Sequence, residues 1–121
     1  MRVCFLAALV IFSLLALGRG EDIKRSHSVT WGARVFRDTH LERVIINEKS
    51  KFLRVVTRDY TFKQQTFYRK ITQIVITDQN KNGKGGYAHL KQGGPGATFA
   101  HIHFKSQRNN GISFIVDIYG L

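Results

Sequence analysis

Apolar and polar residues alternate with a period of two along most of the chain beyond its first twenty residues. Alternation over four to eight residues, with β-branched and aromatic side chains, is typical of half-buried strands. In the last such segment the even positions from Ile112 to Ile118 are apolar, while Ser113 and Asp117 lie opposite. The pattern predicts strands in six segments: Thr39–Ile46, Lys51–Phe62, Arg69–Thr77, Tyr87–Lys91, Thr98–Ser106 and Ile112–Tyr119.

The first of these segments also has one feature of a helix, because Thr39 and Glu42 have the spacing of a capping box. The β-branched residues of Val44–Ile46 favour a strand instead. Phe104 and Phe114 are in phase with the apolar faces of their segments, so both are predicted to lie in the core.

Glycine and asparagine separate the predicted strands. The stretch Gly85–Gly96 holds five glycines and Pro95, the only proline, and turns on either side of a short strand explain it. Asn109–Gly111 joins the last two segments, where Asn-Gly readily takes the positive φ angles of a type I′ turn. The pattern predicts one all-β domain, an antiparallel sandwich or barrel of about seven or eight strands.

The same stretch overlaps a formal match to the dinucleotide-binding pattern G-x-G-x-x-A, at Gly83–Ala88. That pattern has to open a helix, because the helix N-terminus carries the pyrophosphate. Only Tyr87–Gln92 follows before the next glycine pair, and this segment is too short for such a helix. The match is therefore interpreted as accidental, and no cofactor is predicted.

The first twenty residues have the layout of a secretory signal peptide. A positive start at Arg2 precedes the apolar run Val3–Leu17, and small residues follow up to Gly20. The run is short for a transmembrane helix, which needs about 20 residues, so no transmembrane anchor is predicted. The expected division is a cleaved signal peptide, residues 1–20, followed by one all-β domain, residues 21–121.

Cleavage would remove Cys4, the only cysteine, and the remaining domain would begin with the polar Glu21–Ser28, expected to be a loose lead-in. It would also remove Arg2 and Arg19, which leaves 17 of the 19 Lys and Arg against 8 Asp and Glu, a net charge of +9. Such a field favours acidic partners. An acidic protein or a glycan is predicted, with a soluble basic surface as the alternative. Direct sequence-specific nucleic-acid binding is not predicted, because the aromatic residues are explained as core.

The basic side chains are unevenly distributed, since residues 61–121 carry 8 basic and only 2 acidic side chains. Partner binding is therefore predicted on the strands and turns of this half, around the segment Lys63–Lys105. The side chains expected to contact the partner are Lys84, His89, Lys91, Lys105 and Arg108.

His101 and His103 project from the same face of one predicted strand, and His89 on a neighbouring strand is a third candidate ligand. Histidine pairs of this kind can bind zinc or copper. No Cys or carboxylate stands at ligand spacing, so the pair is interpreted as solvent-facing and no metal is predicted.

Groups for catalysis are scarce in the C-terminal half. Asp78 and Asp117 are its only carboxylates, so a paired-acid site is difficult to assemble there. Ser106 and Ser113 lack the context of a nucleophile elbow. Asp78 follows a predicted strand, where Asp commonly closes a turn through its side chain. The chain is predicted not to be an enzyme.

A series of motifs follows in order through the C-terminal half: Ile74–Gln79, Asn82-Gly83, Gly85–Ala88, Gly93–Gly96, Ile102–Arg108 and Gly111–Gly120. Together they resemble the insect family named for multiprotein bridging factor two, whose members include proteins called probable salivary secreted peptides. The resemblance is strong over residues 69–121 and loose over residues 27–68, where Trp31-Gly32 contributes.

The resemblance implies two different functions and no catalytic residues. The founding description of the family is a transcriptional coactivator that bridges a DNA-bound activator and general transcription factors without binding DNA itself. Many members instead begin with signal peptides and are similar to secreted salivary, gut or haemolymph proteins. The leading hypothesis is a secreted, extracellular, non-enzymatic binding protein. The alternatives are an intracellular coactivator that acts through protein–protein contacts, and a lectin-like or lipid-surface binder.

Overall fold

The computed structural model describes residues 26–121, so the predicted signal peptide lies outside the described residues. The described part of the chain holds seven strands, which confirms the all-β prediction. Within residues 26–121 no helix is long and apolar enough to cross a membrane. The strands are β1 (Val29–Gly32), β2 (Thr39–Glu48), β3 (Thr57–Phe62), β4 (Ile71–Asp78), β5 (Tyr87–Gly93), β6 (Ala100–Lys105) and β7 (Ile112–Gly120).

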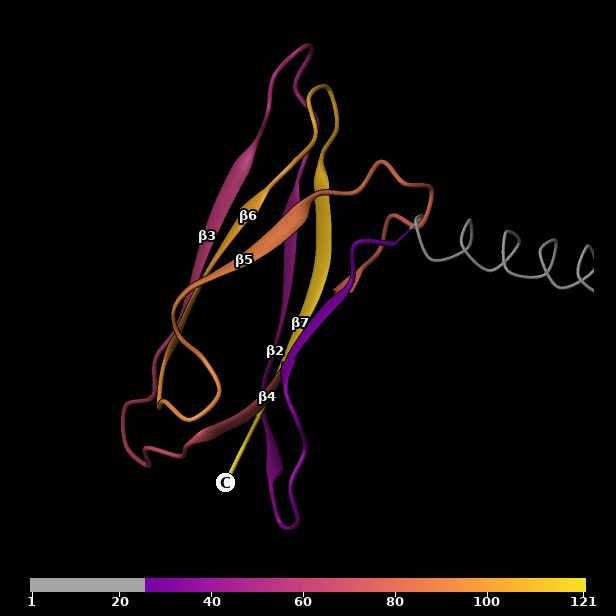
Figure 1. The fold of residues 1–121 in the computed structure, drawn as a ribbon. Coiled ribbons are helices and arrows are strands. Elements are labelled where there is room, and N and C mark those ends of the chain that lie inside the picture. The colour runs from indigo at the N-terminus through magenta and orange to yellow at the C-terminus, as the bar shows by residue number, and fades with distance from the viewer. Residues whose placement is uncertain (1–25) are drawn as a thin grey trace, which may run out of the picture.

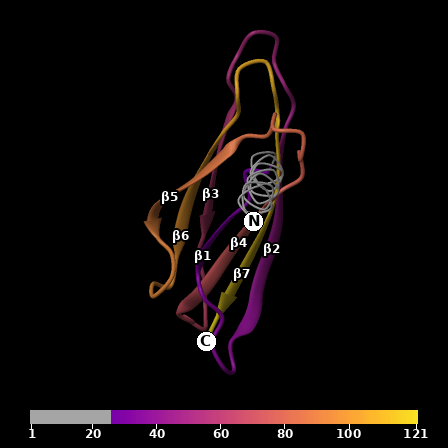
Figure 2. The same cartoon turned by 45° about the vertical axis from the view of Figure 1, so that its right-hand side comes forward.

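The strands form two antiparallel sheets that pack face to face as a sandwich (Figure 1, Figure 2). One sheet has the order β1-β4-β7-β2 and the other has the order β3-β6-β5. Of the two architectures compatible with the sequence pattern, the structure is therefore the sandwich. The core consists of the apolar side chains between the sheets: Ile46, Val56, Phe62, Ile71, Ile74, Ile76, Ala100, Ile102, Phe104, Ile112, Phe114, Val116 and Ile118.

Strands β6 and β7 supply the centre of this core, because alternation turns every second side chain toward the facing sheet. Phe104 on β6 and Phe114 on β7 are fully buried, and their ring centroids are 5.2 Å apart. The core prediction for both residues is confirmed. Burial of each such side chain contributes about 1.5–3 kcal/mol, and residues 26–121 contain no cysteine that could add a disulfide.

The strand prediction is wrong over the first half of Lys51–Phe62. Strand β3 begins only at Thr57, and the residues before it form a turn and a loop. The turn is closed by a 3.0 Å hydrogen bond from the Arg54 N–H to the Lys51 carbonyl oxygen. Leu53 has a φ of 56°, which a strand does not permit.

The glycines at the end of β5 and directly after it confirm the predicted turn. Gly93, Gly94 and Gly96 have φ angles of 71°, 98° and 89°, values that residues with a Cβ rarely adopt. Strand β5 begins at Tyr87, the fifth of the six residues of the formal dinucleotide-binding match Gly83–Ala88, so a strand stands where that pattern requires a helix. The interpretation of the match as accidental is confirmed.

The turn between β6 and β7 is present, but the position of its positive φ angle is not the predicted one. The Asn110 N–H donates to the Gln107 carbonyl oxygen at 3.1 Å, and Asn109 has a φ of 68°. Gly111 has no positive φ. Glycine is required there for a different reason, because a Cβ would overlap the Glu48 carbonyl oxygen.

The connections between strands gather at the two ends of the sandwich (Figure 1). We define the basic end by the β2–β3, β4–β5 and β6–β7 connections, residues 49–56, 79–86 and 106–111. We define the aromatic end by the β1–β2, β3–β4 and β5–β6 connections, residues 33–38, 63–70 and 94–99.

Candidate binding surface at the basic end

Both ends of the sandwich are positively charged, and only the segments of the basic end contain no acidic residue. The three segments that form the aromatic end contain five Lys or Arg and one Asp. A surface with a single sign of charge raises the local concentration of oppositely charged partners and speeds their association. The segments of the basic end contain six Lys or Arg and no Asp or Glu: Lys49, Lys51, Arg54, Lys81, Lys84 and Arg108.

Hydrogen bonds join the β6–β7 connection to the β2–β3 connection. The Leu53 N–H donates to Asn109 Oδ1 at 3.1 Å, and the Asn109 N–H donates to the Arg54 carbonyl oxygen at 2.9 Å. Arg108 Nη1 donates to the Leu53 carbonyl oxygen at 2.8 Å. Each bond links residues more than 50 positions apart in the chain, so the two connections form one hydrogen-bonded unit.

The β4–β5 connection is attached to the fold by the fully buried carboxylate of Asp78. This carboxylate accepts hydrogen bonds from the backbone N–H groups of His27 and Asn80, both at 3.0 Å. The bond from Asn80 confirms the prediction that Asp78 closes a turn through its side chain. A Cβ at Gly85 would overlap the carboxylate, so glycine is required there by close approach and not by its φ angle.

His27 and Gln107 complete this attachment. His27 Nδ1 lies 3.1 Å from the Gly85 carbonyl oxygen, and the ring stacks on Tyr87 with centroids 4.5 Å apart. Gln107 Nε2 donates to the carbonyl oxygens of Gly83 and Gly85 at 2.7 and 2.9 Å. The chain before β1 is therefore fixed at His27, and the prediction of a loose lead-in is wrong there.

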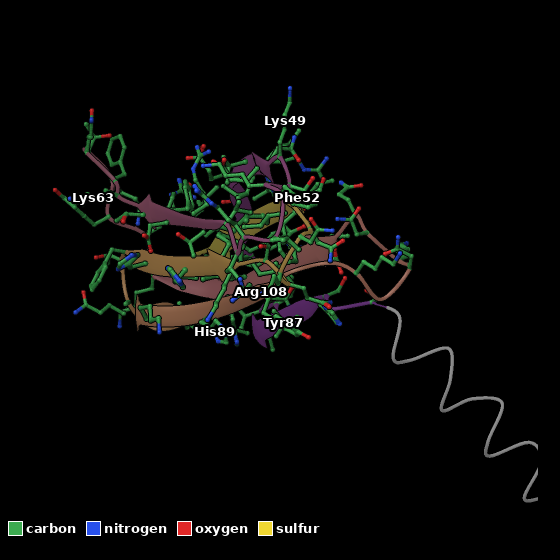
Figure 3. All side chains as sticks on the ribbon, turned by 90° about the horizontal axis from the view of Figure 1, so that it is seen from above. Lys49, Phe52, Lys63, Tyr87, His89 and Arg108 are labelled. Carbon is green, nitrogen blue, oxygen red and sulfur yellow. The ribbon has the colours of Figure 1, made fainter. Side chains whose placement is uncertain are left out.

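The structure brings some of the five predicted binding residues together and separates others. Lys84 and Arg108 belong to the basic end, and Lys105 is the last residue of β6 next to it. His89 lies halfway along β5 (Figure 3). Lys91 occupies an irregularity near the far end of the same strand. The binding role of all five residues stays a prediction.

Histidines line the outer face of the β3-β6-β5 sheet beside Asp59. Asp59 Oδ1 lies 3.2 Å from His101 Nε2 and 2.8 Å from His103 Nδ1, and His89 is paired with His103 across the strands. The hydrogen bond with His103, followed by that with His101, holds the pKa of Asp59 below its ordinary value. Among residues 26–121 no group of three or more His, Cys, Asp or Glu side chains is arranged to hold a metal ion.

Opposite charges neutralise each other on the outer face of the β1-β4-β7-β2 sheet. Asp117 Oδ1 accepts hydrogen bonds from Arg43 Nε at 2.7 Å and from His40 Nε2 at 2.8 Å. These bonds, that from Arg43 first, hold the pKa of Asp117 below its ordinary value. Arg34 lies over the Tyr119 ring at 3.8 Å from its centroid. This face therefore lacks the uncompensated charge of the basic end.

An open pocket of about 300 Å³ lies between β2 and the β3–β4 connection, away from the basic end. Its lining combines the carboxylate of Glu42 with the cations Lys63 and Arg69, and a single carboxylate does not provide the paired acids of a glycoside hydrolase. Ser106, weighed as a nucleophile, is buried and accepts the Val56 N–H at 2.8 Å. That the chain is not an enzyme stays a prediction.

Sequence reasoning missed four of the six cations of the basic end. Lys49, Lys51 and Arg54 precede the half of the chain in which binding was predicted, and Lys81 was not singled out. For Lys81 a signal was present, since residues 79–86 are rich in turn residues and contain cations but no acidic residue, whereas residues 49–56 resemble a strand in the sequence. Their assembly at one end depends on the strand pairing, which the local pattern does not specify.

The fold and this surface define a class of protein, a small antiparallel β-sandwich with a strongly basic end. The chain belongs to the MBF2 family, because the family model described as "Transcription activator MBF2" matches residues 31–120. It is also 38% identical over 99 residues to "Probable salivary secreted peptide" of Bombus ignitus, an alignment that covers 82% of this chain and 73% of that protein. The family resemblance is thereby confirmed. No solved structure matches the chain.

The motifs that carry the family resemblance include residues of the attachment described above. Asp78, Gly85 and Gln107 each belong to one of these motifs, and each fixes the β4–β5 connection. At these three positions the motifs therefore reflect how the sandwich is built.

Proposed function

We propose that this protein is a secreted, non-enzymatic binding protein that contacts an acidic partner through its basic end. The observation that carries the proposal is the set of six cations, without an acidic residue, on three connections joined by hydrogen bonds. Lys and Arg form their strongest contacts with carboxylate, sulfate and phosphate groups. Neighbouring acids would compete for these contacts, and the three segments contain none.

Secretion is supported by the name of the Bombus ignitus relative and by the signal-peptide layout of residues 1–20. Protein recovered from the medium of cells that express the full chain is expected to begin at Arg19 or Glu21. N-terminal sequencing measures this directly. Recovery of the protein in nuclei with Met1 still present would contradict export.

Charge reversal tests the basic end. The double variant Lys51→Glu/Lys84→Glu is expected to weaken binding to immobilised heparin, a sulfated glycan, by about tenfold and to elute at lower salt. The control Lys63→Glu/Lys70→Glu makes the same change of net charge at the aromatic end and is expected to elute close to the wild type. Equal effects of both pairs would show that only net charge matters, and the proposal of a binding end would be wrong.

The family description favours a second function, a transcriptional coactivator that acts through protein–protein contacts. This function requires the chain to remain inside the cell without removal of its first residues. It predicts full-length protein in nuclei and increased transcription of a reporter gene when the full chain is expressed. Absence of both, together with processed protein in the medium, would exclude it.

A further inference from the structure

The tip of the β2–β3 connection is a tight turn that presents two apolar side chains. Phe52 and Leu53 are the central residues of the turn closed between Lys51 and Arg54. Phe52 is 82% exposed and Leu53 is 57% exposed. The free energy falls when a partner removes large apolar side chains at a loop tip from water. The turn is therefore a candidate contact point for an apolar partner.

The backbone of this turn is held in a conformation that favours glycine. Leu53 has a φ of 56°, and turns with a positive φ at this position usually carry Gly or Asn. The contacts that hold it are those of its N–H with Asn109 Oδ1 and of its carbonyl oxygen with Arg108. Residues kept in such conformations by their surroundings cluster at ligand-binding sites.

These contacts also make the tip suitable for an environment without water. In lipid, an N–H or carbonyl group without a hydrogen bond is strongly unfavourable. Both backbone groups of Leu53 are bonded within the protein, at 3.1 and 2.8 Å. The side chains of the tip can therefore enter an apolar layer without stripping water from the Leu53 backbone.

Cations surround the apolar tip. Lys51 and Arg54 flank it in the chain, and Arg108 is bonded to it. Figure 3 looks down on this end of the sandwich, with Lys49, Phe52 and Arg108 labelled. An apolar tip within a set of cations complements an anionic membrane, whose phosphates lie above its acyl chains. A sulfated glycan or an acidic protein face would match the cations and leave the exposed apolar pair unused.

We propose that the basic end binds an anionic phospholipid surface, with Phe52 and Leu53 inserted at the level of the headgroups. The surrounding Lys and Arg side chains contact the lipid phosphates. This inference rests on the proposed function, because it identifies the acidic partner of the basic end as a membrane.

The β1–β2 connection provides a matched control at the opposite end. The Asp38 N–H donates to the Val35 carbonyl oxygen at 3.2 Å, so Phe36 and Arg37 are the central residues of a turn with the same hydrogen-bond pattern. Phe36 is 86% exposed and Arg37 has a φ of 73°. The Arg37 guanidinium lies 5.4 Å from the Phe36 ring centroid, and Asp38 adds a negative charge.

Flotation with vesicles tests the inference on protein purified from cells that express the full chain. Vesicles of phosphatidylserine and phosphatidylcholine at about 3:7 are expected to bind the wild type about tenfold more tightly than vesicles of phosphatidylcholine alone. Phe52→Ser/Leu53→Ser is expected to weaken this binding by about 10- to 100-fold. The control Val35→Ser/Phe36→Ser is expected to remain within about twofold of the wild type.

Fluorescence provides a readout of insertion that does not depend on affinity. The emission of Phe52→Trp, after subtraction of the Trp31 signal of the wild type, is expected to shift to shorter wavelength when mixed vesicles are added. Phe36→Trp is expected not to shift. Vesicle binding that is unchanged in Phe52→Ser/Leu53→Ser, or an unshifted emission of Phe52→Trp, would overturn the inference.

Heparin binding separates this inference from the proposed function. Phe52→Ser/Leu53→Ser is expected to elute from heparin as the wild type does, because both substitutions leave the charge unchanged. A wild type that binds heparin but neither vesicle overturns the membrane inference and leaves the basic end as the site of another acidic partner. A wild type that binds neither heparin nor vesicles overturns both.

Discussion

The turns Val35–Asp38 and Lys51–Arg54 have the same hydrogen-bond pattern, an exposed Phe at the second position and a positive φ at the third, and they differ in what holds them. Asp38 holds the first, because its carboxylate accepts hydrogen bonds from Arg34 Nε at 2.8 Å and from the Val35 N–H at 2.9 Å. The neutral amide oxygen of Asn109 contacts the second.

This difference determines at which of the two turns the neighbouring cations are left without a carboxylate to neutralise them. A carboxylate that fixes a turn also neutralises a neighbouring cation, as Asp38 does in its ion pair with Arg34. An amide provides a hydrogen-bond acceptor without a charge. The Phe52 turn is therefore fixed while Lys51 and Arg54 remain available for an anionic partner. Equal turn geometry thus has different consequences, depending on the side chain that holds it.

The largest expected effect concerns the support of the basic end. Asp78→Asn is expected to lower the free energy of unfolding by about 2–3 kcal/mol, because the two backbone N–H groups bond different carboxylate oxygens and the amide NH2 would face one of them as a second donor. Denaturant unfolding measures the loss. Asp38→Asn serves as the comparison and is also expected to destabilise, because the Asp38 side chain is only 2% exposed. Its carboxylate accepts hydrogen bonds from Arg34, the Val35 N–H and the Thr72 hydroxyl. Unchanged stability of Asp78→Asn would show that the hydrogen bonds of Asp78 do not stabilise the attachment of the β4–β5 connection.

A smaller effect distinguishes the turns by pH. The hydrogen bond from Arg34 is the main cause that lowers the pKa of Asp38 from 3.8 to about 2. Because the folded pKa is the lower one, the stabilisation is complete above about pH 4 and is lost as the pH falls toward 2. Amide-exchange protection of Val35 is expected to fall over this range, while that of Leu53, bonded to Asn109, is expected to stay constant.

Asp38→Asn is the control for this pH dependence. It removes the titrating group, so the protection of Val35 is expected to become independent of pH between 4 and 2. If the protection of Leu53 falls in parallel with that of Val35 in the wild type, the transition is global unfolding, and the proposed difference between the turns is not responsible.

The smallest expected effect concerns backbone strain. Leu53→Gly is expected to raise the free energy of unfolding by about 0.5–1 kcal/mol, because glycine adopts a positive φ without steric cost and this gain exceeds its entropic cost. The same variant is expected to weaken vesicle binding. Arg37→Gly at the other turn is expected to give a similar gain in stability without a change in vesicle binding. A loss of stability in Leu53→Gly would show that the Leu53 side chain contributes packing that outweighs the strain.

Prediction from the sequence succeeded where burial on one face governs the pattern. The segments predicted as Thr98–Ser106 and Ile112–Tyr119 correspond to β6 and β7 within two residues at each end. Both strands lie in the middle of their sheets, with one face on the core, so alternation is enforced along their length. The predicted core residues Phe104 and Phe114 are fully buried for the same reason.

Prediction failed where a distant residue decides the local conformation. The alternation in Lys51–Phe62 continues through a turn, because the turn is stabilised by Asn109 and not by its own residues alone. Strand β1 has only four residues, too few for a periodic signal, and it forms by pairing with β4. Gly85 is consistent with a turn in the sequence, yet its requirement arises from contact with Asp78.

By itself the sequence determined the all-β class, the strands that face the core, the excess of positive charge and the membership of the family. These properties depend on local periodicity, on composition and on ordered motifs, which are all readable along the chain. Only the tertiary structure decided that the fold is a sandwich, that three separate segments form one basic end, and that Leu53 is held at a positive φ. The physical reason is that strand pairing and the hydrogen bonds of Asn109 and Arg108 join residues far apart in the chain.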